Sequence, residues 1–283
     1  MRVLRLKSPR MDGPDVLAWQ QFLASRGFED GGRDGKFGAA TERGSIAYQE
    51  SVGLDGDGIV GDRTYVFARQ DGLTVPGDPT VTGIDTNVNC LPHVTCIAAA
   101  RMSFAVRYYA DASSKTLKTD EARVLVSAGL RLVAVYQDFN NAIGRFSAAE
   151  GTRQANNALR HAARIGQPKD TAIYFAVDFD PTAAQIAGPV TDYFRAINTV
   201  LAGAATRYIP GVYGSGLTCR TIRDAGLAQF TWLSGSTGFQ GSRAFRTEAN
   251  LIQVLPDRKI CGGRLSIDDD IAPDPAAIGS FKI

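Results

Sequence analysis

The chain has 283 residues, with 31 Lys and Arg against 29 Asp and Glu, so its formal charge is only +2. This length exceeds one average domain, and a composition of 44% hydrophobic and 21% charged residues excludes wholesale disorder. The charged residues form no basic tail or stripe, so we expect neither a nucleic-acid nor a membrane partner. Both histidines, His93 and His161, lack the spacing of zinc ligands, and we expect no metal and no cofactor.

The four cysteines leave the redox state open. Cys90 and Cys96 are close in sequence, Cys219 and Cys261 stand alone, and no C-x-x-C motif is present. Two disulfides are one possibility, and Cys90–Cys96 with Cys219–Cys261 is one of the possible pairings. Four buried thiols are the other possibility, because disulfide use follows the compartment.

The N-terminal segment MRVLRLKSPRMDGPD has no apolar run of the length that a signal peptide needs. No stretch approaches the ~18–20 apolar residues of a membrane span. We therefore expect a protein made in the cytoplasm without a signal peptide, which leaves, if it leaves, by another route.

A pattern of the form D-G-x-Φ-G-x-x-T, where Φ is apolar, occurs twice, at residues 34–41 and 57–64. Each copy predicts a glycine turn, one apolar plug (Phe37, then Val60) and a helix start. Together with the apolar periodicity of the segment before them, the two copies predict a three-helix domain over residues 1–73. The predicted helices are 15–28, 41–52 and 62–70.

This segment resembles the three-helix peptidoglycan-binding domain of cell-wall hydrolases. The resemblance covers nearly all of residues 12–73, and its alternative is a generic helical bundle or interaction domain. The matching residues are Asp15-Val16, Gln20, Gln21, Leu23, Gly27-Phe28, both turn motifs, Tyr48-Gln49 and Gly53-Leu54. Gly44 stands where the family usually has Ala, which predicts a looser second helix.

Residues 74–82, TVPGDPTVT, predict a linker, and residues 83–283 predict a second domain in which apolar runs alternate with helix-length segments. Eight strands alternating with helices indicate an α/β fold, a (β/α)8 TIM-type barrel. The gaps shorten after the fifth strand, so we expect an irregular last third. The predicted strands are 83–86, 104–108, 132–136, 173–177, 209–213, 230–233, 251–254 and 265–268.

In such barrels the chemistry lies at the carboxyl ends of the strands. Carboxylates follow the first, third, fourth and eighth predicted strands, and Asp178 and Asp180 share one face of an extended segment. The predicted strand ends carry Asp85, Arg107, Gln137, Asp178, Asp180, Tyr213, Trp232, Gln253 and Asp268.

This arrangement resembles the family 25 glycoside hydrolases, which are lysozyme-type muramidases, and more closely a related glycoside-hydrolase-like domain. The resemblance covers about residues 82–272. It implies cleavage of the glycan of peptidoglycan between N-acetylmuramic acid and N-acetylglucosamine. The carriers are Gly83-Ile-Asp85-Thr, Tyr174-Phe-Ala-Val-Asp178-Phe-Asp180, Gly211-Val-Tyr213-Gly and Ile267-Asp268.

One residue departs from the lysozyme pattern. The family's proton donor is the Glu of an Asp-x-Glu motif, and this chain has Asp180 there. Of the three Glu residues after residue 73, only Glu248 is a rival, and it lies at the wrong end of its strand. The resemblance implies that Asp180 is the acid, that Asp178 supplies electrostatic support or holds the acetamide, and that the substrate's N-acetyl oxygen serves as nucleophile.

The remaining site residues have predicted supporting roles. Asp85 and Asp268 complete the cleft, Tyr213 and Trp232 stack on sugar, and Arg107, Gln137 and Gln253 bind substrate. Each has a structural alternative: Asp180 and Asp85 as strand-end acceptors, Tyr213 and Trp232 as barrel packing. Asp138, next to Gln137, is expected to be a solvated loop residue.

Two functions therefore stay open. The first is a monomeric muramidase that binds peptidoglycan through its N-terminal module and acts in the periplasm or cell wall, as a phage endolysin or a secreted effector. The second is a non-hydrolytic wall-binding protein whose barrel has lost the acid.

Overall fold

The computed structural model describes all residues except 1, 29–30, 112–113 and 206. The chain divides into two compact units, Met1–Thr82 and Gly83–Ile283, which are described separately. In the part of the chain that is described, no helix is both long and apolar enough to cross a bilayer.

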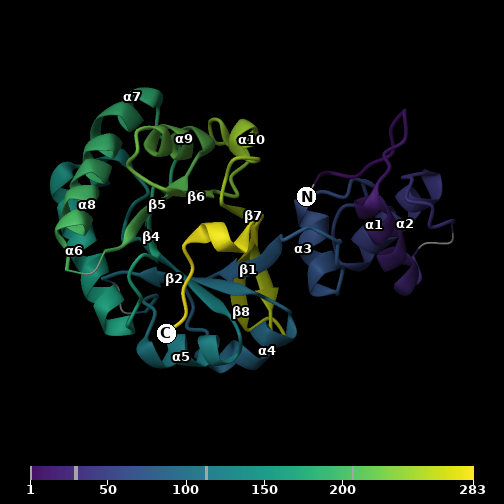
Figure 1. Cartoon of the computed structure of the whole chain (residues 1–283), viewed down its shortest axis with the longest axis horizontal. Helices are drawn as coiled ribbons and strands as arrows, with labels where there is room; N and C mark the ends of the chain where they lie inside the picture. Colours follow the sequence, from purple (N-terminus) through teal and green to yellow (C-terminus); the bar gives the residue numbers. More distant parts are fainter. Residues whose placement is uncertain (1, 29–30, 112–113, 206) are drawn as a thin grey trace. The chain divides into compact units, whose positions relative to one another are not determined.

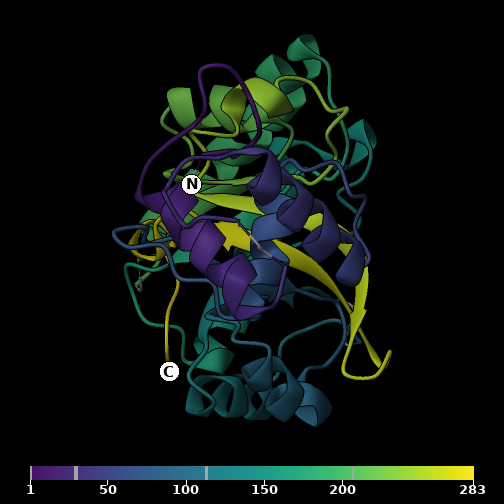
Figure 2. The same ribbon diagram turned by 90° about the vertical axis from the view of Figure 1, so that its right-hand side faces the viewer.

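The first unit contains the three predicted helices, shown together in Figure 2. Its core surrounds Trp19, whose ring contacts Phe22, Tyr48 and Tyr65. The helices are α1 (Pro14–Ser25), α2 (Ala39–Ser51) and α3 (Asp62–Gln70). The first helix ends three residues earlier than expected, since Gly27 adopts a φ of 80° and turns the chain.

Each repeated turn is closed by a buried glutamine. The Gln20 amide donates to the Lys36 carbonyl (3.1 Å) and to Thr41 Oγ1 (3.0 Å), and its oxygen accepts from the Gly35 amide (2.8 Å). Gln49 does the same in the second copy, with Ile59 O (3.0 Å), Thr64 Oγ1 (3.1 Å) and Gly58 N (2.9 Å). The predicted plugs, Phe37 and Val60, are fully buried. The sequence repeat is thus a structural repeat.

Gly44 serves close packing rather than a looser helix. A Cβ at this position would lie 2.6 Å from the carbonyl oxygen of Phe28, closer than any side chain tolerates. The absence of a side chain therefore lets α2 approach the backbone of residue 28.

The second unit is a closed barrel with strand order β1 to β8, confirming the predicted α/β barrel with eight strands (Figure 1). Most of its strands are largely apolar, as expected of strands covered on both faces, whereas the last two, LIQVLPDRKI and LSIDDDIA, also carry several charged residues. The strands are β1 (Val81–Asp85), β2 (Phe104–Tyr109), β3 (Arg131–Tyr136), β4 (Ala172–Ala176), β5 (Ile209–Gly214), β6 (Phe230–Leu233), β7 (Leu251–Ile260) and β8 (Leu265–Ala272).

Helices surround these strands, with α6 and α8 packed side by side outside β4 and β5 (Figure 1). The covering becomes thin after β5, as the shortening gaps predicted. The helices are α4 (Val94–Ala99), α5 (Thr119–Ser127), α6 (Ala148–Ile165), α7 (Ala183–Gln185), α8 (Thr191–Gly203), α9 (Gly216–Asp224) and α10 (Ser242–Phe245).

The eighth strand runs antiparallel to the seventh, whereas the pairs from β1 to β7 are parallel. A tight turn at Gly262 and Gly263, both with positive φ, joins β7 to β8 in a hairpin. Our expectation that the carboxyl end of the eighth strand faces the site is therefore wrong. Carboxylates of β8 reach the site from the middle of the strand.

A disulfide joins Cys96 in α4 to Cys261 at the hairpin turn, with an S–S distance of 2.05 Å. The pairing of Cys90 with Cys96 and of Cys219 with Cys261 is thereby excluded. Cys90 and Cys219 are buried free thiols. The bond connects residues 165 positions apart, a separation that gives no local sequence signal.

Candidate functional site

Asp85 ends β1 as a buried carboxylate, only 2% exposed. Its Oδ1 accepts a hydrogen bond from the Tyr108 hydroxyl (3.0 Å), and its Oδ2 accepts one from Gln253 Nε2 (2.9 Å). Burial and the neighbouring charge of Asp268 raise the pKa of Asp85 to about 7. A carboxyl group with this pKa holds a proton during part of the time near neutral pH.

Gln253 connects two of the predicted carboxylates. Besides Asp85, its amide nitrogen donates to Asp268 Oδ2 (2.8 Å), and its oxygen accepts from the Tyr213 hydroxyl (3.1 Å) and the Gly235 amide (3.1 Å). The structure therefore brings Asp85, Gln253, Asp268 and Tyr213 together as the strand-end argument predicted.

The hairpin strand β8 adds a third carboxylate, Asp270, which was not among the predicted site residues. Asp270 pairs with Gln253 in the β7–β8 ladder and is fully buried. Its Oδ1 accepts from the indole nitrogen of Trp232 (2.9 Å). Burial and the charge of Asp85 raise the pKa of Asp270 well above its usual value, and burial also raises that of Asp268. Three acidic groups crowded in this way hold at least one proton between them at neutral pH.

Asp178, two residues beyond β4, faces this cluster. Its Oδ2 accepts from Gln137 Nε2 (2.9 Å). Burial raises its pKa, against the opposing effects of the Gln137 hydrogen bond and the positive charge of Lys115. The charge of Asp178 in turn contributes to the raised pKa values of Asp268 and Tyr213, so Asp178 lies near enough to these groups to interact with them electrostatically.

Asp180 has a different environment. Both of its oxygens accept from the backbone amide of Gln240, at 3.1 and 3.2 Å. Gln240 also donates from its side chain to the Pro181 carbonyl (3.3 Å). Asp180 thus anchors the loop between β6 and α10, and none of its hydrogen bonds to described residues reaches another carboxylate.

Two of the predicted substrate contacts are wrong, because the side chains of Arg107 and Trp232 are buried. Arg107 is fully buried, pairs with Glu121 (Nε to Oε1, 2.7 Å) and donates to the Thr86 carbonyl. Trp232 is 1% exposed, so its ring offers no surface for a sugar.

Tyr213 is 8% exposed, packs edge-on against Trp232 (centroids 4.5 Å apart) and contributes its hydroxyl group to the Gln253 network. It is therefore no stacking surface either. The position of a residue along a strand does not reveal how deep its side chain lies in the barrel. For this reason the predicted substrate contacts of Arg107, Trp232 and Tyr213 are wrong.

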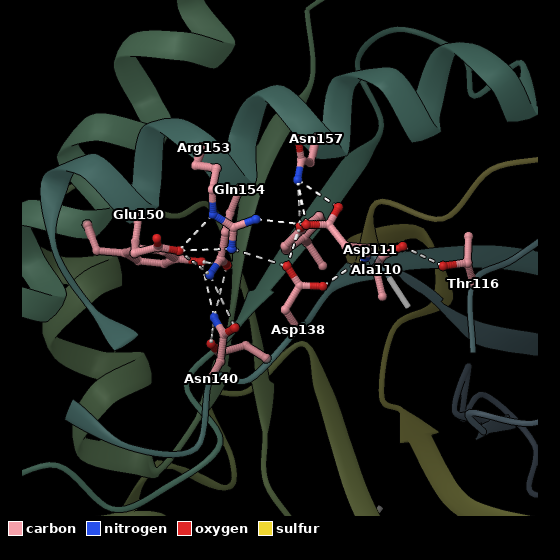
Figure 3. Close-up of polar contacts among 12 residues, drawn as sticks. Ala110, Asp111, Thr116, Asp138, Asn140, Glu150, Arg153, Gln154 and Asn157 are labelled. Carbon is pink, nitrogen blue, oxygen red and sulfur yellow. Dashed lines mark hydrogen bonds and ion pairs between the residues drawn. The ribbon is translucent and has the colours of Figure 1, made fainter. Parts of the chain in front are cut away.

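Asp138, predicted to be a solvated loop residue, is part of a polar network with Asp111 and Arg153 (Figure 3). It accepts from the Tyr136 hydroxyl (2.6 Å) and the Asp111 amide (2.8 Å) and pairs with Arg153 (3.3 Å). Arg153 also pairs with Asp111 (2.8 Å) and Glu150 (2.9 Å). The network ties the loops after β2 and β3 to α6.

The same network fixes the backbone beside Asp178. Asn140 donates to Gln154 Oε1 (3.0 Å) and to the Ala176 carbonyl (3.0 Å), and its own carbonyl accepts from the Asp178 amide (2.8 Å). Such a satisfied polar network holds a site rigid.

Among the described residues, no group of three or more His, Cys, Asp or Glu side chains is arranged to hold a metal ion. His161 stacks on Tyr109, with ring centroids 5.5 Å apart. The cluster of Asp85, Asp268 and Asp270 can hold protonated and ionised carboxyl groups side by side. Acid-catalysed glycosidic cleavage uses a pair of carboxyl groups of this kind.

Residues 12–67 match the family described as "Putative peptidoglycan binding domain". Across 81% of its length the chain is 28% identical to the uncharacterized protein YbfG of Bacillus subtilis (strain 168), and it spans about a third (33%) of that protein.

Solved structures share the barrel. The Mycobacterium tuberculosis Tat-secreted protein Rv2525c, crystallised with L-tartrate, is similar with a TM-score of 0.60 and 26% identity over 71% of this chain and 98% of that one. The modular autolysin LytC from Streptococcus pneumoniae, crystallised with a synthetic peptidoglycan ligand, has a TM-score of 0.51 and 9% identity over 71% of this chain and 48% of that one. This second likeness shows a shared fold. Residues 95–272 match the family model of the Rv2525c-like, glycoside hydrolase-like domain, and the chain belongs to this family.

Proposed function

We propose that the barrel hydrolyses the glycan strand of peptidoglycan between N-acetylmuramic acid and N-acetylglucosamine, while residues 12–67 hold the cell wall. The observation that carries this proposal is the group of carboxyl residues with raised pKa values at one end of the barrel, Asp85, Asp178, Asp268 and Asp270. Glycosidic cleavage needs one protonated carboxyl group to protonate the leaving oxygen. It also needs a second polar group to support positive charge at the anomeric carbon.

Asp178 is the acid that the geometry favours. It lies on the solvent side of the cluster, burial raises its pKa, and the hydrogen bond from Gln137 engages one of its two oxygens. In this role it donates its proton to the glycosidic oxygen as the C–O bond breaks. The substrate's acetamide oxygen then bonds to the anomeric carbon, and water later opens that ring as its proton passes to the Asp178 carboxylate. Asp85 and Asp268, held together by Gln253, face the developing positive charge.

Asp180 is the acid that the resemblance to the lysozymes implies. Its contact with the Gln240 amide gives it a second, structural role. The contact engages both oxygens of the residue at the lysozyme acid position, and the alternative function, a wall-binding barrel without hydrolysis, applies if Asp178 does not serve as the acid instead.

The proposed place of action is the cell wall. Support comes from the match of residues 12–67 to the peptidoglycan-binding family and from the relative Rv2525c, which is Tat-secreted. We propose peptidoglycan as the partner of both units and a monomer as the working form.

The test is incubation of the whole chain with purified peptidoglycan. We expect new reducing ends without new free amines, since a glycosidase exposes a hemiacetal and a peptidase or amidase exposes an amine. Asp178→Asn should lower the rate by roughly 10²–10⁴-fold, the usual contribution of a general acid.

Asp180→Asn and Asp192→Asn complete the set. Asp192 is exposed on α8 and pairs only with Arg195 among the contacts described, so it serves as the control. Full loss in Asp180→Asn with activity kept in Asp178→Asn would return the acid role to Asp180. Wild-type protein that sediments with peptidoglycan but releases no reducing ends would establish the non-hydrolytic alternative.

A further inference from the structure

Phe139 lies in the loop after β3 and is 69% exposed, more than any other large hydrophobic side chain in the described part of the chain. A single exposed apolar residue is common on protein surfaces and by itself means little. Its location is what gives this residue significance.

Two contacts to Asp178 bracket Phe139 in the sequence. Gln137 donates to the Asp178 carboxylate (2.9 Å), and the Asn140 carbonyl accepts from the Asp178 amide (2.8 Å). Asn140 is fixed in turn by Gln154, and Asp138 by Arg153 (Figure 3). The backbone that carries the phenyl ring is therefore held beside the proposed acid, and binding there orders little additional structure.

A cation accompanies this ring. The guanidinium carbon of Arg145 lies 5.6 Å from the ring centroid of Phe139. Arg145 is exposed, and the next residue, Phe146, is buried against Phe179, with ring centroids 5.6 Å apart. The turn Ile143–Arg145 is thus attached to the segment between Asp178 and Asp180, and the guanidinium retains donors for a ligand.

These two groups complement an acidic sugar. The C–H face of a pyranose ring is apolar and stacks on an aromatic ring, and a guanidinium group pairs with a carboxylate through two parallel hydrogen bonds. Tyr213 and Trp232, the aromatic residues expected from the strand ends, are buried and leave this role to Phe139.

We propose that Phe139 and Arg145 form a rim subsite that binds an acidic N-acetylated sugar, with its ring face on Phe139 and its carboxylate on Arg145. The subsite rests on the proposed function for its substrate class, and it adds a preference for acidic over neutral glycans.

The test is calorimetric titration of the whole chain with two peptide-free tetrasaccharides. One contains N-acetylmuramic acid with free lactyl carboxylates, and the other is the neutral tetramer of N-acetylglucosamine. Phe139→Ala should weaken the binding of both by about tenfold, the loss of one stacking contact, and Phe139→Trp should retain it. Arg145→Gln should weaken only the acidic probe, by about fivefold at low salt, and high salt should remove that difference.

Val124→Ala is the matched control, because Val124 is an exposed apolar residue on the outer helix α5. The proposal is overturned if Phe139→Ala binds both probes like Val124→Ala, if Arg145→Gln weakens both probes equally, or if the wild type binds neither. Reducing-end assays keep the two proposals apart. If the wild type binds in a way that depends on Phe139 but cleaves nothing, the proposed hydrolase activity is wrong and the subsite is retained. If Phe139→Ala cleaves normally and binds as the wild type does, only the proposed subsite is wrong.

Discussion

Both units of this protein use buried glutamines at central positions, but with different partners. In the N-terminal unit, Gln20 and Gln49 each bind backbone groups, one hydroxyl and one carboxylate of their own turns, Asp34 (3.3 Å) and Asp57 (2.8 Å). In the barrel, Gln253 donates from one nitrogen to two carboxylates, Asp85 and Asp268. The first arrangement places a single carboxylate among backbone groups and a hydroxyl, and it stabilises a fold. The second keeps acidic groups together that would otherwise repel each other, which costs stability and provides chemistry.

The largest stability effect is expected in the N-terminal unit. Gln20→Ala should lower the free energy of unfolding by about 3 kcal/mol, because it leaves the buried Gly35 amide and its partners without hydrogen bonds. Urea unfolding followed by tryptophan fluorescence measures this, since each unit carries one tryptophan, Trp19 and Trp232. The adjacent Gln21 is exposed, so Gln21→Ala is the control. Equal stability of the two variants would contradict the structural role of Gln20.

The next effect concerns pH and the barrel. The pKa of Asp85 is about 7 in the folded protein and near 3.8 when unfolded, so the folded state binds its proton more tightly. Stability from this group is therefore greatest below pH 4 and is lost as the pH rises toward and through 7. Asp85→Asn should flatten that decline, by on the order of 2 kcal/mol between pH 5 and pH 8.

Thermal unfolding at both pH values checks this prediction, with Asp192→Asn as the exposed control on the same unit. An unchanged slope in Asp85→Asn would show that the carboxylate cluster does not oppose folding. The comparison between the two glutamines would then fail.

The smallest effect tests the packing of the N-terminal unit. Gly44→Ala places a methyl group against the Phe28 carbonyl and should cost about 1–2 kcal/mol of unfolding free energy, even though Ala is the better helix former. Gly32→Ala has open space around the new Cβ and is the matched control in urea titrations. A stabilised Gly44→Ala would restore the simple propensity argument.

Much of the fold could be predicted because its signals are local. Buried strands are short apolar runs, and the doubled turn motif marks two helix starts. The direction of β8 also had a local signal, the Gly262-Gly263 pair between two strands, which is typical of a hairpin. The regular order of eight strands instead suggested that all eight are parallel, which is wrong for β8.

The site could be predicted only in part. Strand ends correctly grouped Asp85, Gln253 and Asp268, because parallel strands of a barrel end at one rim. The depth of Arg107 and Trp232 depends on tertiary packing, and the ion-pair partner of Arg107 is a helix residue, Glu121, whose role no motif announces. Asp270 shares one strand face with Asp268, but the run Asp268-Asp-Asp270 is typical of a solvated turn or a cation-binding loop, so only Asp268 was predicted as a site residue.

The bond between Cys96 and Cys261 has a topological consequence. It closes a covalent ring that contains β2 to β7, while β1 and β8 lie outside it. A protease that cuts a loop anywhere within that ring opens it without releasing a fragment, and the nicked chain remains one molecule until the disulfide is reduced. Electrophoresis of nicked protein would therefore show one band without a reductant and two bands with it.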